Sequence, residues 1–473
     1  MASKQPLRGV LMLTAAMAVA SGLPARADTL ADALVKAYQT SPQLDAGRAA
    51  LRGIDENVPQ ARASRRPQLD GAIGGSISGN LDELDRKLYD ARAALNASLL
   101  IFDSGATRAG LEAARNAVAA GRADLKDIEQ TVLYNAVAAY ADVRRDQEFV
   151  TLANNDVRRL NETLDATRNR FDVGEVTRTD VSQSEARLAE SRSSLAAARG
   201  ALSVSQASYV SAVGAPPRDL APLPSKPALP KSVAEAQSIA LKSNPQLIAA
   251  QFDERVAVYD FDRSIAAKRP SVTARANAGV RRGNAYPPSI FGTATDDVWS
   301  TEPYGEVSIE GSMPLYDGGR NDSLVRQAQA LLDQRRYQVQ LAGRSVSEAV
   351  ATSWAELESA RAAIVARREQ AEAARIAADG VAEEARLGAR STIEVLDADQ
   401  DLLEAQAQIV QALRDEYVAT YGVLRAMGLL TVEHLNLGIP TYDPEVNFDR
   451  VQAGPLGGYD TSAVDRIRSR WEK

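Results

Sequence analysis

Apolar residues recur every seven positions along two long stretches of the chain. The first series comprises Leu111, Val118, Leu125, Val132, Val143, Val150, Val157, Leu164 and Phe171, with one step of eleven residues after Val132. The second lies 214 residues later and comprises Val325, Leu332, Val339, Val346, Leu357, Ile364, Ala371, Ala378 and Ala385. A seven-residue repeat is typical of a coiled coil, and a step of eleven locally unwinds it. Because neither stretch contains proline, we expect two helices of about 66 residues, each roughly 100 Å long.

Shorter heptad series follow Gly174 and Gly388. The first comprises Val181, Leu188, Leu195, Leu202 and Tyr209, and the second comprises Val395, Leu402, Ile409, the polar Glu416 and Val423. These series predict returning helices about half as long as the first two, so that each half of the chain forms a helical hairpin. The pattern from Thr29 to Ser64 predicts one more helix of about 36 residues, which is long enough to cover the rest of a long helix.

Elsewhere apolar residues alternate with polar ones, which is the period of a β-strand. The alternation is clearest in Tyr89–Ile101, Val272–Val280 and Val307–Leu315, while Leu69, Ile73 and Ile77 share one face of a Gly-rich segment. We therefore expect four strands, at about 67–79, 89–102, 270–281 and 304–316. Each is at least as long as the 9 to 11 residues, roughly, that a tilted strand needs to cross a bilayer.

The second half of the chain repeats the first. The tetrapeptide Ser41–Leu44 (SPQL) reappears as Asn244–Leu247 (NPQL) at an offset of 203, whereas the turn glycines 174 and 388 are 214 apart, so the second half carries an insertion of 11 residues. A tandem duplication follows from this similarity. The first repeat spans 28–214 with its helical hairpin at 105–214, a Pro-rich linker spans 215–231, and the second repeat spans 232–428 with its helical hairpin at 318–428.

Four strands cannot close a barrel around a lumen. A sheet that crosses a bilayer must close, because an open edge leaves backbone groups unpaired in lipid. Several copies of the chain must then share one barrel, and the sequence permits two, three or four. Tyr89 and Phe102 bracket one strand and Tyr304 and Tyr316 another, as a girdle of interfacial aromatic residues would. The same residues could also pack at the strand ends of a soluble sheet.

The remaining segments are interpreted from their composition. Residues 1–27 begin with basic residues, continue through an apolar run too short to span a bilayer, and end in a small-x-small pattern, which predicts a cleaved signal peptide and an exported protein. Gly79–Leu88 and Arg282–Glu302 should join the strands at the end away from the helices. Residues 429–473 should form a C-terminal periplasmic tail.

Composition excludes most chemistry. The chain has no Cys and one His, His434, which rules out disulfides, thiolate metal sites and a lipid-acceptor Cys and leaves little for imidazole catalysis. Its net charge of −7 disfavours nucleic-acid binding. The sequence contains no nucleophile-elbow, zinc-protease, P-loop or dinucleotide motif. We therefore expect no enzymatic activity, no cofactor and no bound metal.

These features together resemble the TolC-type outer-membrane factor family, over Asp28 to Leu430. The most specific are the duplication and two turn motifs, FDVGEVTRTDV at 171–181 and LGARSTIEVLDA at 387–398. The resemblance implies a mainly α protein with a membrane β-barrel. It implies a homotrimer whose 12-stranded barrel lies in outer-membrane lipid on top of a periplasmic α-helical barrel closed at its tip.

The resemblance also implies partners and a gate. A periplasmic adaptor protein and an inner-membrane ABC or RND-type pump would dock at the helical turns, whose residues here are Val173, Gly174, Glu175, Leu387, Gly388 and Ala389. Acidic residues would narrow the periplasmic mouth, and by motif these are Asp180, Glu394 and Asp397, with Thr179 and Arg390 as bonding partners.

A simpler role for these carboxylates stays open at the sequence level. Thr177-x-x-Asp180 and Ser391-x-x-Glu394 each fit a capping box, in which the acid bonds the backbone at the start of a helix. Glu394 and Asp397 lie on one helix face, which a solvated acidic face would also show.

The sequence therefore favours a passive outer-membrane exit channel of a tripartite export system, for type I secretion, multidrug efflux or both. The alternative is a periplasmic adaptor protein. Such a protein would carry one coiled-coil hairpin between the halves of a lipoyl-like domain, and it would not show four strands of bilayer length.

Overall fold

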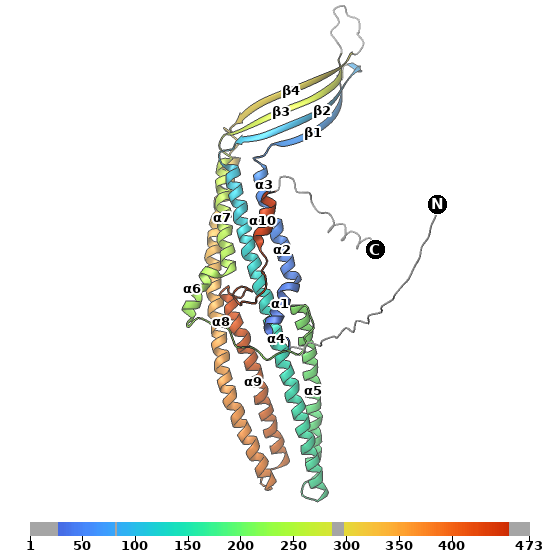
Figure 1. Ribbon diagram of the computed structural model, residues 1–473, viewed down its shortest axis with the longest axis vertical. Helices are drawn as coiled ribbons and strands as arrows, with labels where there is room; N and C mark the ends of the chain where they lie inside the picture. The colour runs from blue at the N-terminus through green and yellow to red at the C-terminus, as the bar shows by residue number, and fades with distance from the viewer. Residues whose placement is uncertain (1–26, 81–82, 286–297, 454–473) are drawn as a thin grey trace, which may run out of the picture.

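The structure, a computed structural model, describes residues 27–80, 83–285 and 298–453. A four-stranded sheet lies at one end of the molecule, and the helices run away from it to two hairpin turns at the other end (Figure 1). The expectations for the signal peptide and for the last residues of the tail fall outside the described residues. Within the described part of the chain, no helix is both long enough and apolar enough to span a membrane.

Two long helices run through most of the molecule's length. These are α4 (Ala106–Asp172) and α8 (Arg320–Arg386), each of 67 residues and so about 100 Å long. The shorter helices α5 (Arg178–Val213) and α9 (Thr392–Ala426) return antiparallel to them. The heptad series lies on the packed face: in α8 its buried members are Leu332, Val346, Leu357, Ile364, Ala371, Ala378 and Ala385. Only toward the tip does the series of α4 become exposed, at Phe171.

The expected single helix from Thr29 to Ser64 is wrong. Three helices occupy it: α1 (Leu30–Thr40), α2 (Pro42–Asp55) and α3 (Asn57–Ala63). Pro42 has no backbone N–H and disfavours a helical residue before it, so Ser41 is extended and instead caps α2 by accepting a hydrogen bond from the Leu44 N–H. The second repeat breaks in the same way before Pro245, giving α6 (Val233–Ser243) and α7 (Pro245–Ala266).

These short helices complete the cover of the long ones. α1, α2 and α3 follow one another along the sheet-proximal half of α4, and α5 covers the half that leads to the tip (Figure 1). In the second repeat α6 packs on α8 and α7 packs on both α8 and α4, so α7 joins the two long helices near the sheet.

The sheet is antiparallel in the order β1-β2-β3-β4, with β1 at Gln68–Asn80, β2 at Glu83–Phe102, β3 at Ser271–Ala285 and β4 at Val298–Ser312. Three strands differ from the expected bounds. β2 begins six residues early, β3 continues to residue 285, and β4 is displaced toward the N-terminus, because backbone pairing extends past the point where apolar alternation fades. The connections at the far end are therefore shorter than expected, at 81–82 and 286–297, and lie outside the described residues.

Register gives the sheet two unlike faces. One face is apolar and includes Leu69, Ile73, Ala93, Leu95, Ala276, Val280, Val307 and Ile309. The other face is polar and carries the ion pairs Arg275–Glu310 and Arg281–Asp90 and the hydrogen bond from Asn96 to Asp70 at 2.8 Å. A sheet of this kind is built to lie between an apolar and an aqueous phase.

The main hydrophobic core lies at mid-height, where both hairpins meet the short helices. Tyr140 of α4 is fully buried there, and its hydroxyl donates to the Ala221 carbonyl at 2.7 Å, which fixes the extended linker across the core. Part of the expected tail also packs: α10 (Pro444–Ala453) lies on α2 and α3, with a 2.7 Å hydrogen bond from Asn447 to Asp55.

Candidate gate at the hairpin tips

The two hairpin turns have the same backbone geometry. Gly174 and Gly388 end the long helices with φ of 81° and 80°. In each turn the backbone N–H three residues past the last helical residue donates to the carbonyl five residues before it at 2.9 Å, from Glu175 to Arg170 and from Ala389 to Glu384. This closure satisfies the last helical carbonyls and favours glycine. It leaves the side chains of Val173 and Leu387 exposed at the end of the molecule.

Each returning helix begins with a capping box. The Thr177 N–H and hydroxyl both donate to Asp180, and those of Ser391 both donate to Glu394. Hydrogen bonds from Thr177 lower the pKa of Asp180. The backbone N–H of Ser391, followed by the guanidinium of Arg390, lowers the pKa of Glu394 to about 2. Both acids are therefore charged near neutral pH, and the capping interpretation of these two residues is confirmed.

The turns of the two hairpins lie beside each other. Thr392, in the second hairpin, lies close enough to Asp180 in the first to help lower its pKa. Arg390 instead pairs within its own hairpin, with Glu384 at 2.8 Å and Glu394 at 2.7 Å, and these carboxylates raise its pKa. Thr179 is exposed at the first turn. No group of His, Asp and Glu side chains in the described segments is arranged to hold a metal ion.

Asp397 joins the two hairpins. Its carboxylate accepts a 2.6 Å hydrogen bond from Arg187 of α5, which also bonds Glu190 at 3.1 Å. Sequence reasoning missed Arg187, because the two partners are 210 residues apart and neither position stands out in its own helix.

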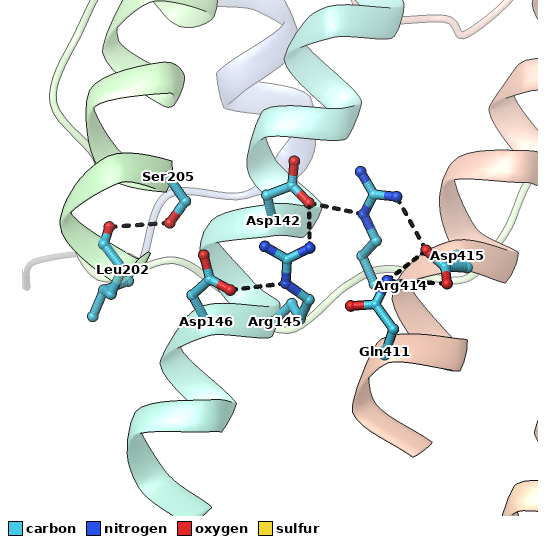
Figure 2. Close-up of polar contacts among 8 residues, drawn as sticks. All are labelled: Asp142, Arg145, Asp146, Leu202, Ser205, Gln411, Arg414 and Asp415. Carbon is cyan, nitrogen blue, oxygen red and sulfur yellow. Dashed lines mark hydrogen bonds and ion pairs between the residues drawn. The ribbon is translucent and has the colours of Figure 1, made fainter. Parts of the chain in front are cut away.

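Two further ion-pair clusters connect α9 to α4 above this point. Arg159 of α4 bonds Asp399 of α9 at 2.8 Å and Asp156 of its own helix at 3.1 Å. Nearer mid-height, Figure 2 shows Arg414 of α9 between Asp142 of α4 and Asp415, with Arg145 beside them. The second hairpin is thus attached to the first by charged contacts spaced from mid-height to the tip.

At the other end of the molecule, register places the aromatic residues. Tyr89 lies on the apolar face and stacks on Trp299 of β4 with ring centroids 6.0 Å apart. Phe102 reaches the apolar face through a bulge after Leu100.

The other two expected girdle residues are placed differently. Tyr304 is on the polar face, against Gly279, because it is an even number of residues from Glu306 and Glu310 in the same strand and so points to the same side. Tyr316 lies beyond the end of β4. Trp299, and not Tyr304, therefore accompanies Tyr89 on the apolar face.

Comparison with known proteins covers both halves of the chain. The family model described as outer membrane efflux protein matches residues 33–215 and 237–429. The outer membrane efflux protein BepC of Brucella suis is 34% identical over 434 residues, which are 92% of this chain and 92% of BepC. The outer membrane protein TolC of Escherichia coli is 25% identical over 417 residues, 86% of this chain and 84% of TolC.

A solved structure has the same fold. The outer membrane protein VceC of Vibrio cholerae superposes with a TM-score of 0.70 at 20% identity, over 84% of this chain and 96% of that chain.

Proposed function

Because the chain belongs to the outer membrane efflux protein family, and so is an outer-membrane channel component of an export system with a long periplasmic portion, we propose that three copies form one conduit gated at the hairpin tips. The carrying observation is the sheet. Its strands have 13, 20, 15 and 15 residues, and its two faces are apolar and polar.

The sheet edges support closure between copies. Within the described residues, β1 and β4 each pair on one side only, so each copy presents two edges whose backbone groups need partners in lipid. Pairing β4 of one copy with β1 of the next satisfies both edges. Two copies would close about eight strands, which leaves an interior filled by side chains, whereas three copies close twelve around an open lumen.

The hairpins would then enclose a tunnel whose mouth lies at the tips. Threefold symmetry turns Asp397 and Glu394 into rings of three carboxylates each, and a narrow ring of like charge attracts cations. Asp180, Thr179 and Arg390 lie on the turns next to these rings, where a neighbouring copy could exchange their partners as the mouth opens. The capping role of Asp180 and Glu394 is compatible with this one, because a capping carboxylate remains charged.

The exposed turns are the docking sites for partners. One turn contains Val173, Gly174 and Glu175, and the other contains Leu387, Gly388 and Ala389. Both turns lie at the end of the molecule opposite the sheet (Figure 1), with the side chains of Val173 and Leu387 exposed. A periplasmic adaptor protein would bind there and connect the channel to an inner-membrane ABC or RND-type pump, for secretion or for drug efflux. The chain itself acts as a conduit, and the adaptor alternative finds no support in either repeat.

Planar-bilayer recordings test the gate. Replacing Asp397 with Ala removes one carboxylate from each of three copies at the mouth, so the channel should lose cation selectivity, seen as a smaller reversal potential in a salt gradient. Glu383→Ala removes the same charge from α8, where Glu383 pairs with Arg386 of its own helix, and should leave selectivity nearly unchanged. Equal selectivity in the Asp397→Ala channel and the wild type would remove Asp397 from the gate, and a protein that forms no channels would contradict the conduit.

A further inference from the structure

A charged cluster lies in the contact between the two hairpins, above the tips. Arg159 donates to both Asp156 and Asp399, and the Ser191 hydroxyl of α5 donates to Asp156. A small cavity beside these side chains is also lined by Arg187, Glu190 and Leu396. The cluster therefore joins α4, α5 and α9 at one point.

The two carboxylates are withdrawn from water. The side chains of Asp156 and Asp399 are only 6% and 16% exposed. Leu160, Leu164, Leu188 and Leu396 form an apolar contact directly beside them. Two acids share the guanidinium of Arg159, so when both are ionised the central trio carries one net negative charge in a poorly hydrated place, where such a charge is disfavoured.

Every helix packed around Asp399 contributes charge to its environment. The groups are Asp156 and Arg159 on α4, Arg187 and Glu190 on α5, Asp379 with its partner Arg375 on α8, and Asp397 on α9 itself. Arg187 is already bonded to Asp397 and Glu190, and Arg375 to Asp379 and Glu372. The nearest bases are thus engaged elsewhere, and Arg159 is left to neutralise two acids.

We propose that Arg159 and Asp399 are positioning residues that set, through one proton, how firmly the second hairpin is held against the first. The proposal rests on the proposed function, because separation of the hairpins matters only if the mouth must open. When Asp399 takes a proton from solvent, its repulsion from Asp156 ends, while Arg159 keeps its 3.3 Å hydrogen bond across the hairpins to the backbone carbonyl of Asp399, which does not titrate. The contact is then tightest in mild acid and loosens as the pH rises.

The direction follows from proton linkage. Burial raises the pKa of Asp399, an effect that the charge of Arg159 opposes and the charges of Asp156 and Asp379 reinforce. In separated hairpins Asp399 is hydrated and its pKa returns toward the ordinary value. The closed state therefore binds the proton more tightly, so the stability that the proton gives is present below the ordinary pKa and is lost as the pH rises through the raised one.

The capping acids at the tips respond in the opposite sense. The pKa values of Asp180 and Glu394 are lowered, so their stabilising bonds are intact at neutral pH and are lost only when the pH falls through those low values, about 2 for Glu394. Mild acid thus acts on the Asp399 cluster and leaves the caps unchanged, which separates the two effects experimentally.

Hydrogen exchange of the assembled protein in detergent, measured between pH 4.5 and 7.5 and corrected for the intrinsic pH dependence of exchange, tests the proposal. Peptides covering 156–164 and 394–403 should become better protected as the pH falls, by about threefold over this range if the pKa of Asp399 in the closed state lies one unit above its ordinary value, and by about tenfold only well below that value. Asp399→Asn keeps an acceptor for Arg159 without the charge, so protection should be high and independent of pH.

Two further variants sharpen the result. Arg159→Gln leaves two acids without their base, so exchange at pH 7.5 should be about tenfold faster than in the wild type and should slow in acid. Glu404→Gln is the matched control, because Glu404 is exposed on α9 and accepts a hydrogen bond from Gln408 of the same helix; it should behave like the wild type.

Two outcomes would overturn the proposal: wild-type protection that does not change with pH, or the wild-type pH dependence persisting in Asp399→Asn. If the Arg159→Gln variant fails to assemble, the proposal is still tested by comparing the pH dependence of exchange in Asp399→Asn with that in Glu404→Gln. Exchange is measured without conduction, so a negative result leaves the proposed conduit intact, whereas the absence of an assembled oligomer would count against the conduit itself.

Discussion

At the residue scale, two glycines with the same backbone angle have different surroundings. Gly388 at the second tip has φ of 80° and a Cβ added to it would meet nothing within 4 Å. Gly428 ends the second hairpin with φ of 79°, and a Cβ there would lie 2.5 Å from the carbonyl oxygen of Ser243. Gly388 is needed only because the backbone is left-handed there. Gly428 is needed for the same reason and also because there is no room for a side chain.

This difference predicts unequal costs of the same substitution. Gly388→Ala should cost about 1–2 kcal/mol, because only the left-handed backbone is strained. Gly428→Ala should cost at least about 2 kcal/mol more, because backbone of the α6–α7 break must also move. Thermal unfolding of the two variants measures the difference, and equal shifts in Tm would show that the close approach at Gly428 is relieved without penalty.

Single residues also show what sequence reasoning could and could not supply. Both capping boxes were readable, because their partners are three residues apart. The face on which Tyr304 lies could also be predicted, because residues an odd number of positions apart in a strand, such as Tyr304 and Val307, point to opposite faces. The position of Tyr304 at the end of a strand was a weaker guide than this alternation. The face of Phe102 could not be predicted from alternation, because a bulge after Leu100 moves Phe102 to the other face of the sheet. The contact between Arg159 and Asp399 could not be predicted either, because the two residues are 240 positions apart in the sequence.

At the scale of elements, β2 offers a matched test of the two sheet faces. Ala93 and Ala94 are neighbours in this strand, Ala93 pairing with Ile73 on the apolar face and Ala94 with Ala72 on the polar face. Ala93→Arg should impair assembly in the outer membrane, by about 2 kcal/mol, because it puts a cation into lipid. Ala94→Arg should be tolerated, because it points into water.

The amount of folded protein in isolated outer membranes measures this difference. Equal loss in both variants would mean that neither face is aqueous, and a greater loss for Ala94→Arg would invert the assignment of the faces.

Helices were more predictable than strands in their lengths. Heptad spacing extends through α4 and α8 because the same face is packed along the whole hairpin, so both ends could be found from the flanking glycines. The break before Pro42 was overlooked, although proline itself is the physical signal. Strand ends were less certain, because β2 and β4 stay paired beyond the apolar stretch that reveals them.

At the scale of the whole molecule, the proposed conduit has its sheet toward the cell exterior and its hairpin tips in the periplasm. The chain has no cysteine, so Ser78→Cys near the far end of β1 and Leu387→Cys at the second tip each introduce a single thiol. A membrane-impermeant maleimide on intact cells should label Ser78→Cys, and should label Leu387→Cys only after the outer membrane is permeabilised. The reverse pattern would place the hairpins outside the cell.

The fold of one copy was largely predictable from the duplication and the two hydrophobic periods. The number of copies was not, because closure depends on pairing between chains and nothing within one chain counts its neighbours. The number of strands per chain gives only a lower bound on the number of copies, because an export channel needs a lumen and eight strands would not leave one open.

The mass of the folded assembly, measured by native mass spectrometry after release from detergent, tests the central claim most directly. Two unpaired sheet edges per copy require a complex of several chains, and an open lumen requires at least three, so we expect three chains and no folded monomer with its sheet intact. A monodisperse folded monomer would contradict the shared barrel, and a stable complex of two chains would contradict the open lumen, on which the conduit and its gate depend.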